Sequence, residues 1–340
     1  MRVVLPARIG PEELIESNIP LDDDGHQEWD PDKEYDQGER VVLTEEHDGR
    51  QPTQRIYRAL TSNQGAFPAE HTIDEVGADE AKWQDLGGIN RFRAFDEVVG
   101  SKSVSDASYD PELYNPEGQE ALDQGVAFRF KPGVVTDSLT LLGLEASYLD
   151  VVVVNEDGVQ YQKRHELQTT IPESDWHAYF FAEPERDQEL VLTELPLVSE
   201  DMTIEDLPGT LEAEFRISAY NGGAPAKIGN ILVGQSYRVG ESGFGAEASI
   251  VDFSTKERDE FGHFRVRERA FANRAQVPVL IETARIQRVQ RFLAQIRSRP
   301  AVYIASKELG PTVFGFYKRF RLLYQNAVLS ECELTIEGLI

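Results

Sequence analysis

Cysteine and histidine are scarce in this sequence, and the spacing of its potential catalytic and metal-binding residues predicts no such site. The single cysteine, Cys332, excludes a Cys-based zinc site, and the six histidines show neither HxxxH nor HExxH spacing. Asp30–Asp36 begins like a calcium loop, but Tyr35 stands where that loop needs glycine and Val41 where it needs glutamate. Ser242 lies in no GxSxG motif. We therefore expect neither enzyme activity nor a cofactor or metal ion.

Four aromatic residues in the first hundred positions are the best candidates for a binding site. They are Trp29, Tyr35, Tyr57 and Trp83. An exposed indole or phenol ring stacks on the apolar face of a sugar ring, while acids and amides bind the sugar hydroxyls. We therefore expect these residues to contact a glycan. The alternative is that the four rings form the core of a small module, and the solvent exposure of Trp29 and Trp83 distinguishes the two.

A second set of polar residues adjoins predicted strands in the C-terminal part. Such side chains can pair across an interface, and Phe314, Phe316 and Phe320 alternate with other residues so that one face packs while the other docks. The expected interface residues are Asp252, Ser254, Lys256, Arg265, Arg267, Arg269, Tyr317 and Lys318. The alternative for residues 252–256 is a local turn network inside one subunit.

The overall charge excludes one large class of partner. The chain has 340 residues, with 34 Lys and Arg against 60 Asp and Glu, a formal net charge of −26. Nucleic-acid binding needs clustered positive charge. No apolar run approaches the roughly 20 residues of a membrane span, and Met1–Pro6 lacks the apolar segment of a secretion signal. We expect a protein made inside a cell, with no nucleic-acid partner and no membrane insertion.

The charge is also unevenly distributed along the chain. Residues 1–90 contain 21 acidic and 8 basic residues, whereas residues 255–340 contain 9 acidic and 15 basic residues. Opposite charge at the two ends could steer one copy of the chain against another, or against a charged partner. The alternative is a basic C-terminal face that is merely solvated.

Short apolar strands separated by turn residues predict a mainly β protein in three units. Residues 1–98 are rich in turns and predict a small β module. Residues 99–235 carry longer apolar strands, such as Val151–Val154, and predict a jelly-roll sandwich. Residues 236–340 predict a further β unit with one amphipathic helix at 284–297, where apolar residues recur at three- and four-residue spacings.

Parts of the sequence resemble two known families. The pattern Tyr35-x2-Gly-x2-Val, then Tyr57-x-Ala, then a tryptophan before Leu-Gly, is similar to carbohydrate modules of the chitin-binding type. The next stretch, Trp83-x2-Leu-Gly followed by Asn-Arg-Phe-x2-Phe-Asp at 90–96, resembles a signature of tail proteins of long-tailed bacteriophages, with Phe92 where tryptophan is usual. Segments of the C-terminal unit follow the same phage family. The likeness covers about residues 29–96 and 234–340, and the middle resembles only a generic galactose-binding-like jelly roll.

The phage resemblance implies a structural virion protein of the tail tip or baseplate, assembled in the cytoplasm of the host bacterium. Its implied partners are other tail-tip proteins, further copies of itself in a closed ring, and a host surface glycan bound during adsorption. The C-terminal unit would attach to the tail while the other two units project. The alternatives are a scaffold without glycan affinity, a polysaccharide depolymerase and a secreted lectin. A depolymerase needs a pair of catalytic carboxylates, and among 60 acidic residues the sequence singles out no such pair.

Overall fold

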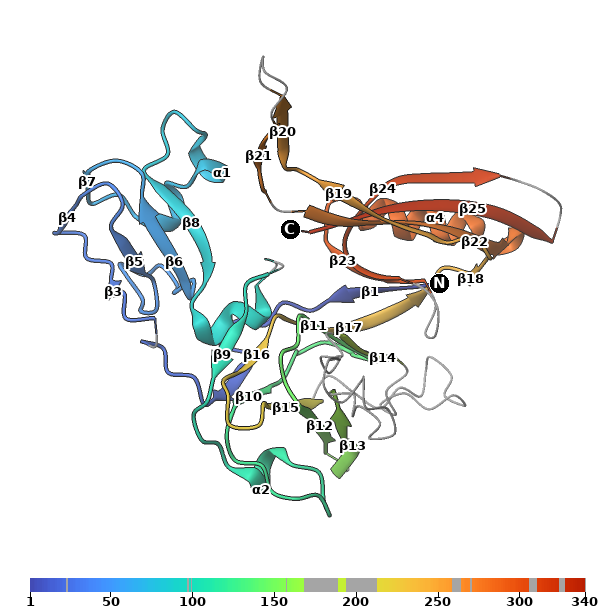
Figure 1. Ribbon diagram of the computed structural model, residues 1–340, viewed down its shortest axis with the longest axis horizontal. Helices are drawn as coiled ribbons and strands as arrows, with labels where there is room; N and C mark the ends of the chain where they lie inside the picture. Colours follow the sequence, from blue (N-terminus) through green and yellow to red (C-terminus); the bar gives the residue numbers. More distant parts are fainter. Residues whose placement is uncertain are drawn as a thin grey trace.

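Runs of branched and aromatic residues between turns form strands throughout the chain, and the fold is mainly β, as predicted. The computed structural model describes residues 1–339 except 23, 97, 99, 157, 168–188, 194–212, 259–263, 270, 306–310 and 324–327. Figure 1 shows a small β module on one side of the molecule, a sandwich beneath, and a C-terminal unit on the other side, from which a two-stranded arm projects.

One large antiparallel sheet runs from the sandwich into the C-terminal unit. Its strands, in spatial order, are β14 (Glu189–Thr193), β11 (Ser138–Leu142), β17 (Asn230–Arg238), β1 (Arg2–Pro6), β23 (Ala301–Ile304), β24 (Thr312–Leu323), β25 (Leu329–Gly338), β22 (Phe271–Glu282) and β18 (Glu241–Ser242), with β19 (Glu247–Asp252) also paired to β22. Strand β1 lies in the middle of this sheet, where Val3 pairs with Tyr237 on one side and Tyr303 on the other.

The sandwich is completed by a second antiparallel sheet. Its order is β13 (Gly158–Glu166), β12 (Tyr148–Asn155), β15 (Glu214–Tyr220), β10 (Val126–Phe130) and β2 (Leu14–Ser17). Phe128 and Phe215 of this sheet pack in one core with Leu139 and Val233 of the large sheet, and all four are fully buried. The sandwich is therefore the expected two-layer architecture, while its finer assignment to a galactose-binding-like jelly roll stays a prediction.

The C-terminal unit packs one helix on the large sheet. The predicted helix is confirmed as η4 (Thr283–Arg285) continuing into α4 (Ile286–Gln295). Its apolar stripe is buried against the sheet at Ile286, Val289 and Leu293, because residues three and four apart share one face of a helix. The remaining pair in this part of the chain, β20 (Thr255–Arg258) and β21 (Phe264–Arg267), forms the projecting arm.

The N-terminal module has a separate small core. Its strands are β3 (Gln27–Glu28), β5 (Arg40–Val42), β6 (Arg55–Ala59) and β8 (Trp83–Gly88) in one sheet, with β4 (Glu34–Tyr35) and β7 (Asn63–Gln64) in another. The short helices η1 (Pro68–Glu70) and α1 (Ile73–Val76) precede β8, and η2 (Asn90–Phe95) leads into the sandwich. Between the module and the sandwich lie β9 (Ser103–Ser105), paired with β16 (Ala226–Ile228), and α2 (Pro111–Tyr114).

The unit boundaries differ from those expected at 1–98, 99–235 and 236–340. Strand β1 belongs to the large sheet and β2 to the sandwich, so the first twenty residues are not part of the N-terminal module. Strand β17 crosses the expected boundary at 235 without interruption. The reason is that strand pairing over more than 200 residues of sequence leaves no local signal.

Candidate functional site

The four N-terminal aromatics form the core of the module. Trp29, Tyr35, Tyr57 and Trp83 are each at most 2% exposed. The rings of Tyr35 and Trp83 meet edge to face with centroids 5.4 Å apart, and Trp83 Nε1 donates to the carbonyl of Ala66 at 2.9 Å. A sugar cannot stack on a ring that has no exposed face. The expected glycan contact through these rings is therefore corrected to the alternative, a structural core.

Four of the expected interface residues form a local hydrogen-bond network at the base of the arm. Asp252 accepts from the Ser254 amide at 2.8 Å and from Lys256 Nζ at 2.7 Å, and Ser254 Oγ accepts from the amide of Arg269 at 3.0 Å. The hydrogen bonds from Lys256 and Ser254 hold the pKa of Asp252 below its usual range. These bonds fix the turn from β19 into β20, so the turn-network alternative describes these residues.

The remaining expected interface residues have different environments. Tyr317 is partly buried, and its hydroxyl donates to the carbonyl of Leu293 at 2.9 Å, so it pins α4 to β24 and is corrected from interface to core. Lys318 is exposed and lies 3.1 Å from Glu337 Oε1. Arg267 is exposed on β21, and the side chain of Arg265 lies outside the described residues.

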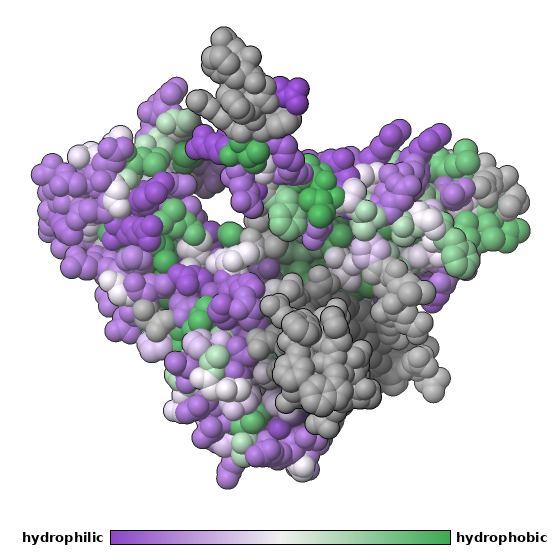
Figure 2. Space-filling model, viewed as in Figure 1, coloured by the Kyte–Doolittle hydropathy of each residue, from purple (hydrophilic) through white to green (hydrophobic). Residues whose placement is uncertain are grey.

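Exposed apolar side chains gather where the arm joins the sheet. They are Ile250 (67% exposed), Phe253 (41%), Val266 (65%) and Phe271 (56%). Strand β19 pairs only with β22 among the strands that the structure describes, so its other edge is free. Figure 2 shows hydrophobic surface at this junction, bordered by hydrophilic residues. Sequence reasoning identified the basic residues here but missed the apolar ones.

This apolar surface continues the buried face of the C-terminal unit. Alternate residues of a strand share a face, so Phe271 lies on the same side of β22 as Ala275 and Val277, which are buried in the core beneath α4. Ile250 is opposite Asn273 in the β19–β22 register and shares that side. The core face therefore extends past the buried part of β22 and is left open to solvent at Ile250 and Phe271.

A cleft of about 630 Å³ lies between the module and the sandwich. It is lined by residues 8–13, residues 51–55, Gly88, Phe92, Phe95 and Asp96. Gln54 in its wall is 5% exposed, has a left-handed φ of 57°, and its Oε1 has no hydrogen-bond partner among the residues that the structure describes. Non-glycine residues held in that conformation recur at ligand sites. Aromatic rings, amides and charges of both signs suit a small polar ligand.

One wall of the cleft is the Asn-Arg-Phe-x2-Phe-Asp stretch, which joins the two units. The Asn90 side chain donates to the carbonyl of Val104 and accepts from its amide, both at 2.8 Å. Phe95 packs edge to face on Phe128 in the sandwich core. Burial raises the pKa of Asp96, whose two oxygens accept backbone amides at 3.1 Å. This stretch is therefore a structural joint.

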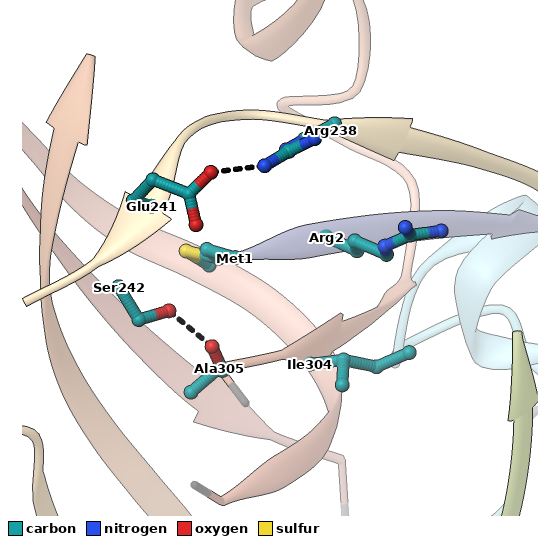
Figure 3. Close-up of a pocket in the computed structure, with 7 residues that line it drawn as sticks. All are labelled: Met1, Arg2, Arg238, Glu241, Ser242, Ile304 and Ala305. Carbon is teal, nitrogen blue, oxygen red and sulfur yellow. Dashed lines mark hydrogen bonds and ion pairs between the residues drawn. The ribbon is translucent and has the colours of Figure 1, made fainter. Parts of the chain in front are cut away.

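A smaller pocket of about 320 Å³ lies where β1 meets β18 (Figure 3). Its polar groups bind one another: Arg238 pairs with Glu241, Ser242 Oγ donates to the Ala305 carbonyl, and the Met1 ammonium donates to the Gly240 carbonyl. Burial lowers the pKa of that amino group. These polar contacts therefore hold neighbouring strands together, and we assign no ligand to the pocket.

The described residues contain no cluster of metal-ligating side chains. Within the same part of the chain, no helix combines the length and apolar character that spanning a membrane requires. Comparisons with protein-family profiles, with curated proteins and with solved structures give no match. The function therefore has to be inferred from the geometry described above together with the sequence patterns.

Proposed function

We propose that this protein is a structural component of the tail tip or baseplate of a long-tailed bacteriophage, and that it assembles through its C-terminal unit. The observation that carries the proposal is the projecting arm, β20–β21, with the free edge of β19 and the exposed apolar side chains at its base. The phage-like sequence of residues 234–340 supports the assignment of this unit to tail attachment.

A free strand edge beside exposed apolar residues favours contact with another chain. Unpaired backbone groups on an edge strand template strand addition, and soluble proteins normally protect such edges. Clustered exposed apolar residues mark interaction sites. In a virion, neighbouring tail-tip proteins or further copies of the chain would cover this surface. The proposed location is accordingly the virion, and the proposed role needs no catalysis.

Native mass spectrometry tests this proposal, first on the purified protein alone and then after mixing with the tail proteins encoded beside it. We expect a defined oligomer or a complex with those neighbours. Replacement of residues 255–267 by a short Gly-Ser link should abolish association while leaving the unfolding midpoint of the remaining sheet unchanged. A persistent monomer that ignores every neighbouring tail protein would contradict the proposal.

A second candidate function, glycan binding during adsorption, is favoured by the cleft rather than by the buried aromatics. The cleft is lined by the partly exposed ring of Phe95 and by the exposed residues Arg8 and Gln51. On a glycan array, Arg8→Ala and Gln51→Ala should each weaken the binding of any sugar that the unmodified protein recognises. Arg40→Ala and Gln37→Ala are exposed controls outside the cleft and should leave binding unchanged. Equal loss in all four variants, or no bound glycan, would remove this candidate.

A further inference from the structure

The N-terminal module carries an exposed acidic surface, which we call the α1 surface and define as residues 73–80. Ile73 is 47% exposed at its start. The acidic side chains around it, Asp74, Glu75, Asp79 and Glu80, are all exposed. None of these four carboxylates forms an ion pair with a residue that the structure describes. An apolar residue is thus surrounded by uncompensated negative charge.

The arm carries the complementary combination. The arm surface consists of the exposed apolar residues Ile250 and Phe271 together with the exposed basic residues Arg267 and Arg269. Contact between the two surfaces would bury apolar side chains at its centre and pair opposite charges around them. This is the usual anatomy of a protein–protein interface, in which apolar contacts are surrounded by a polar rim. Complementary charge also accelerates encounter and fixes orientation.

We infer that the arm surface of one copy binds the α1 surface of a second copy. This inference rests on the proposed assembly role and names the partner surface. Both surfaces lie toward the same side of the molecule in Figure 1, and in Figure 2 an opening lies below them, between the module and the C-terminal unit. The contact joins two different surfaces of the chain, so it forms twice between the two copies of a closed two-fold dimer, or once between successive copies of a ring.

Charge reversal tests the contact, since none of the side chains involved forms a hydrogen bond with a residue that the structure describes. The arm variant carries Arg267→Glu and Arg269→Glu, and the α1 variant carries Asp79→Lys and Glu80→Lys. Each variant alone should weaken self-association at least about 10-fold in sedimentation velocity at low salt, because like charges then face each other. An equimolar mixture of the two variants should recover oligomers with an even number of copies, because each contact between unlike variants joins opposite charges. A chain carrying all four changes should recover the oligomer of the unmodified chain.

Matched controls separate this contact from general charge effects. Arg285→Glu and Glu34→Lys change exposed residues outside both surfaces and should leave association unchanged. All variants should keep the unfolding midpoint of the unmodified chain, which excludes misfolding as the cause of any loss. The oligomer should also weaken in high salt, which screens charge pairs.

The outcomes distinguish this inference from the proposed function. If the unmodified chain forms oligomers that both variants also form, or if the chain carrying all four changes fails to recover them, the arm–α1 contact is wrong while the assembly role stands. If the unmodified chain stays monomeric but binds neighbouring tail proteins, the contact is equally overturned. If it neither self-associates nor binds those proteins, the proposed function fails together with the inference.

Discussion

At the residue scale, the burial of Trp83 shows that this ring belongs to a structural core and not to a sugar-binding surface. Its ring is fully buried and its indole nitrogen is bonded to Ala66. Trp83→Ala should lower the free energy of unfolding of the module by about 3–5 kcal/mol, as measured by urea titration. Phe244→Ala is the control, because Phe244 is fully exposed and its loss should change stability by less than about 0.5 kcal/mol. Equal effects of the two substitutions would contradict the assigned core.

Glu145 supplies a residue-scale prediction about pH. Its carboxylate lies 2.7 Å from Lys102 Nζ and 2.7 Å from Lys227 Nζ, and these hydrogen bonds lower its pKa to about 2. A carboxylate whose pKa is lower in the folded chain stabilises the fold above its ordinary pKa of 4.5, and that contribution is lost as the pH falls toward 2. Glu145→Gln should therefore flatten the fall in urea midpoint between pH 4.5 and 2. Glu34→Gln, an exposed control, should retain the slope of the unmodified chain.

At the element scale, Tyr317 tests whether β24 presents a docking residue or anchors the helix. Its hydroxyl bonds a carbonyl of α4 at 2.9 Å. Tyr317→Phe should lower the unfolding free energy by about 1 kcal/mol, the usual contribution of one such hydrogen bond. The same substitution should leave self-association in sedimentation velocity unchanged. If the substitution weakened self-association without changing stability, Tyr317 would be an interface residue after all.

Elements with a local pattern were predictable from the sequence. The helix within 284–297 repeats apolar residues at helical spacing, and Val151–Val153 of the valine run are buried in β12, as expected of an apolar strand. The sequence did not indicate that the four module aromatics are buried, because their residue types and spacing are compatible both with a core and with a sugar-binding surface. Of the arm surface, the sequence predicted the basic residues but not the apolar ones, because an apolar residue such as Ile250 is expected in the core when only the sequence is known.

At the scale of the whole molecule, β1 joins the sandwich to the C-terminal unit. Val3 and Val4 are fully buried on opposite faces of the large sheet. Val4→Asp would place a charge in a core and should destabilise both units by about 4 kcal/mol or more. Differential scanning calorimetry should show the two units losing stability together while the N-terminal module, with its separate core, is unaffected. A shift confined to one unit would contradict this coupling.

The cleft is also a property of the whole molecule and could not be predicted from any one segment. Its walls come from residues 8–13, 51–55 and 88–96, which meet only after β2 has joined the sandwich and η2 has oriented the module. The sequence marked the Asn-Arg-Phe-x2-Phe-Asp stretch as distinctive. Its role as a joint depends on Asn90 bonding to Val104, a contact that the pattern does not reveal.

The position of β1 also has a consequence for the order of events during synthesis. The partners of this strand, β17 and β23, end at Arg238 and Ile304, so the ribosome must add more than 200 residues before either partner exists. At roughly 5–20 residues per second, this takes on the order of tens of seconds, during which Val3 and Val4 have no sheet to enter. We expect β1 to stay protease-sensitive in nascent chains arrested before residue 230 and to become protected in full-length chains. Strand β1 is thus made long before the strands that it pairs with, and its apolar residues need protection in the nascent chain until those strands follow.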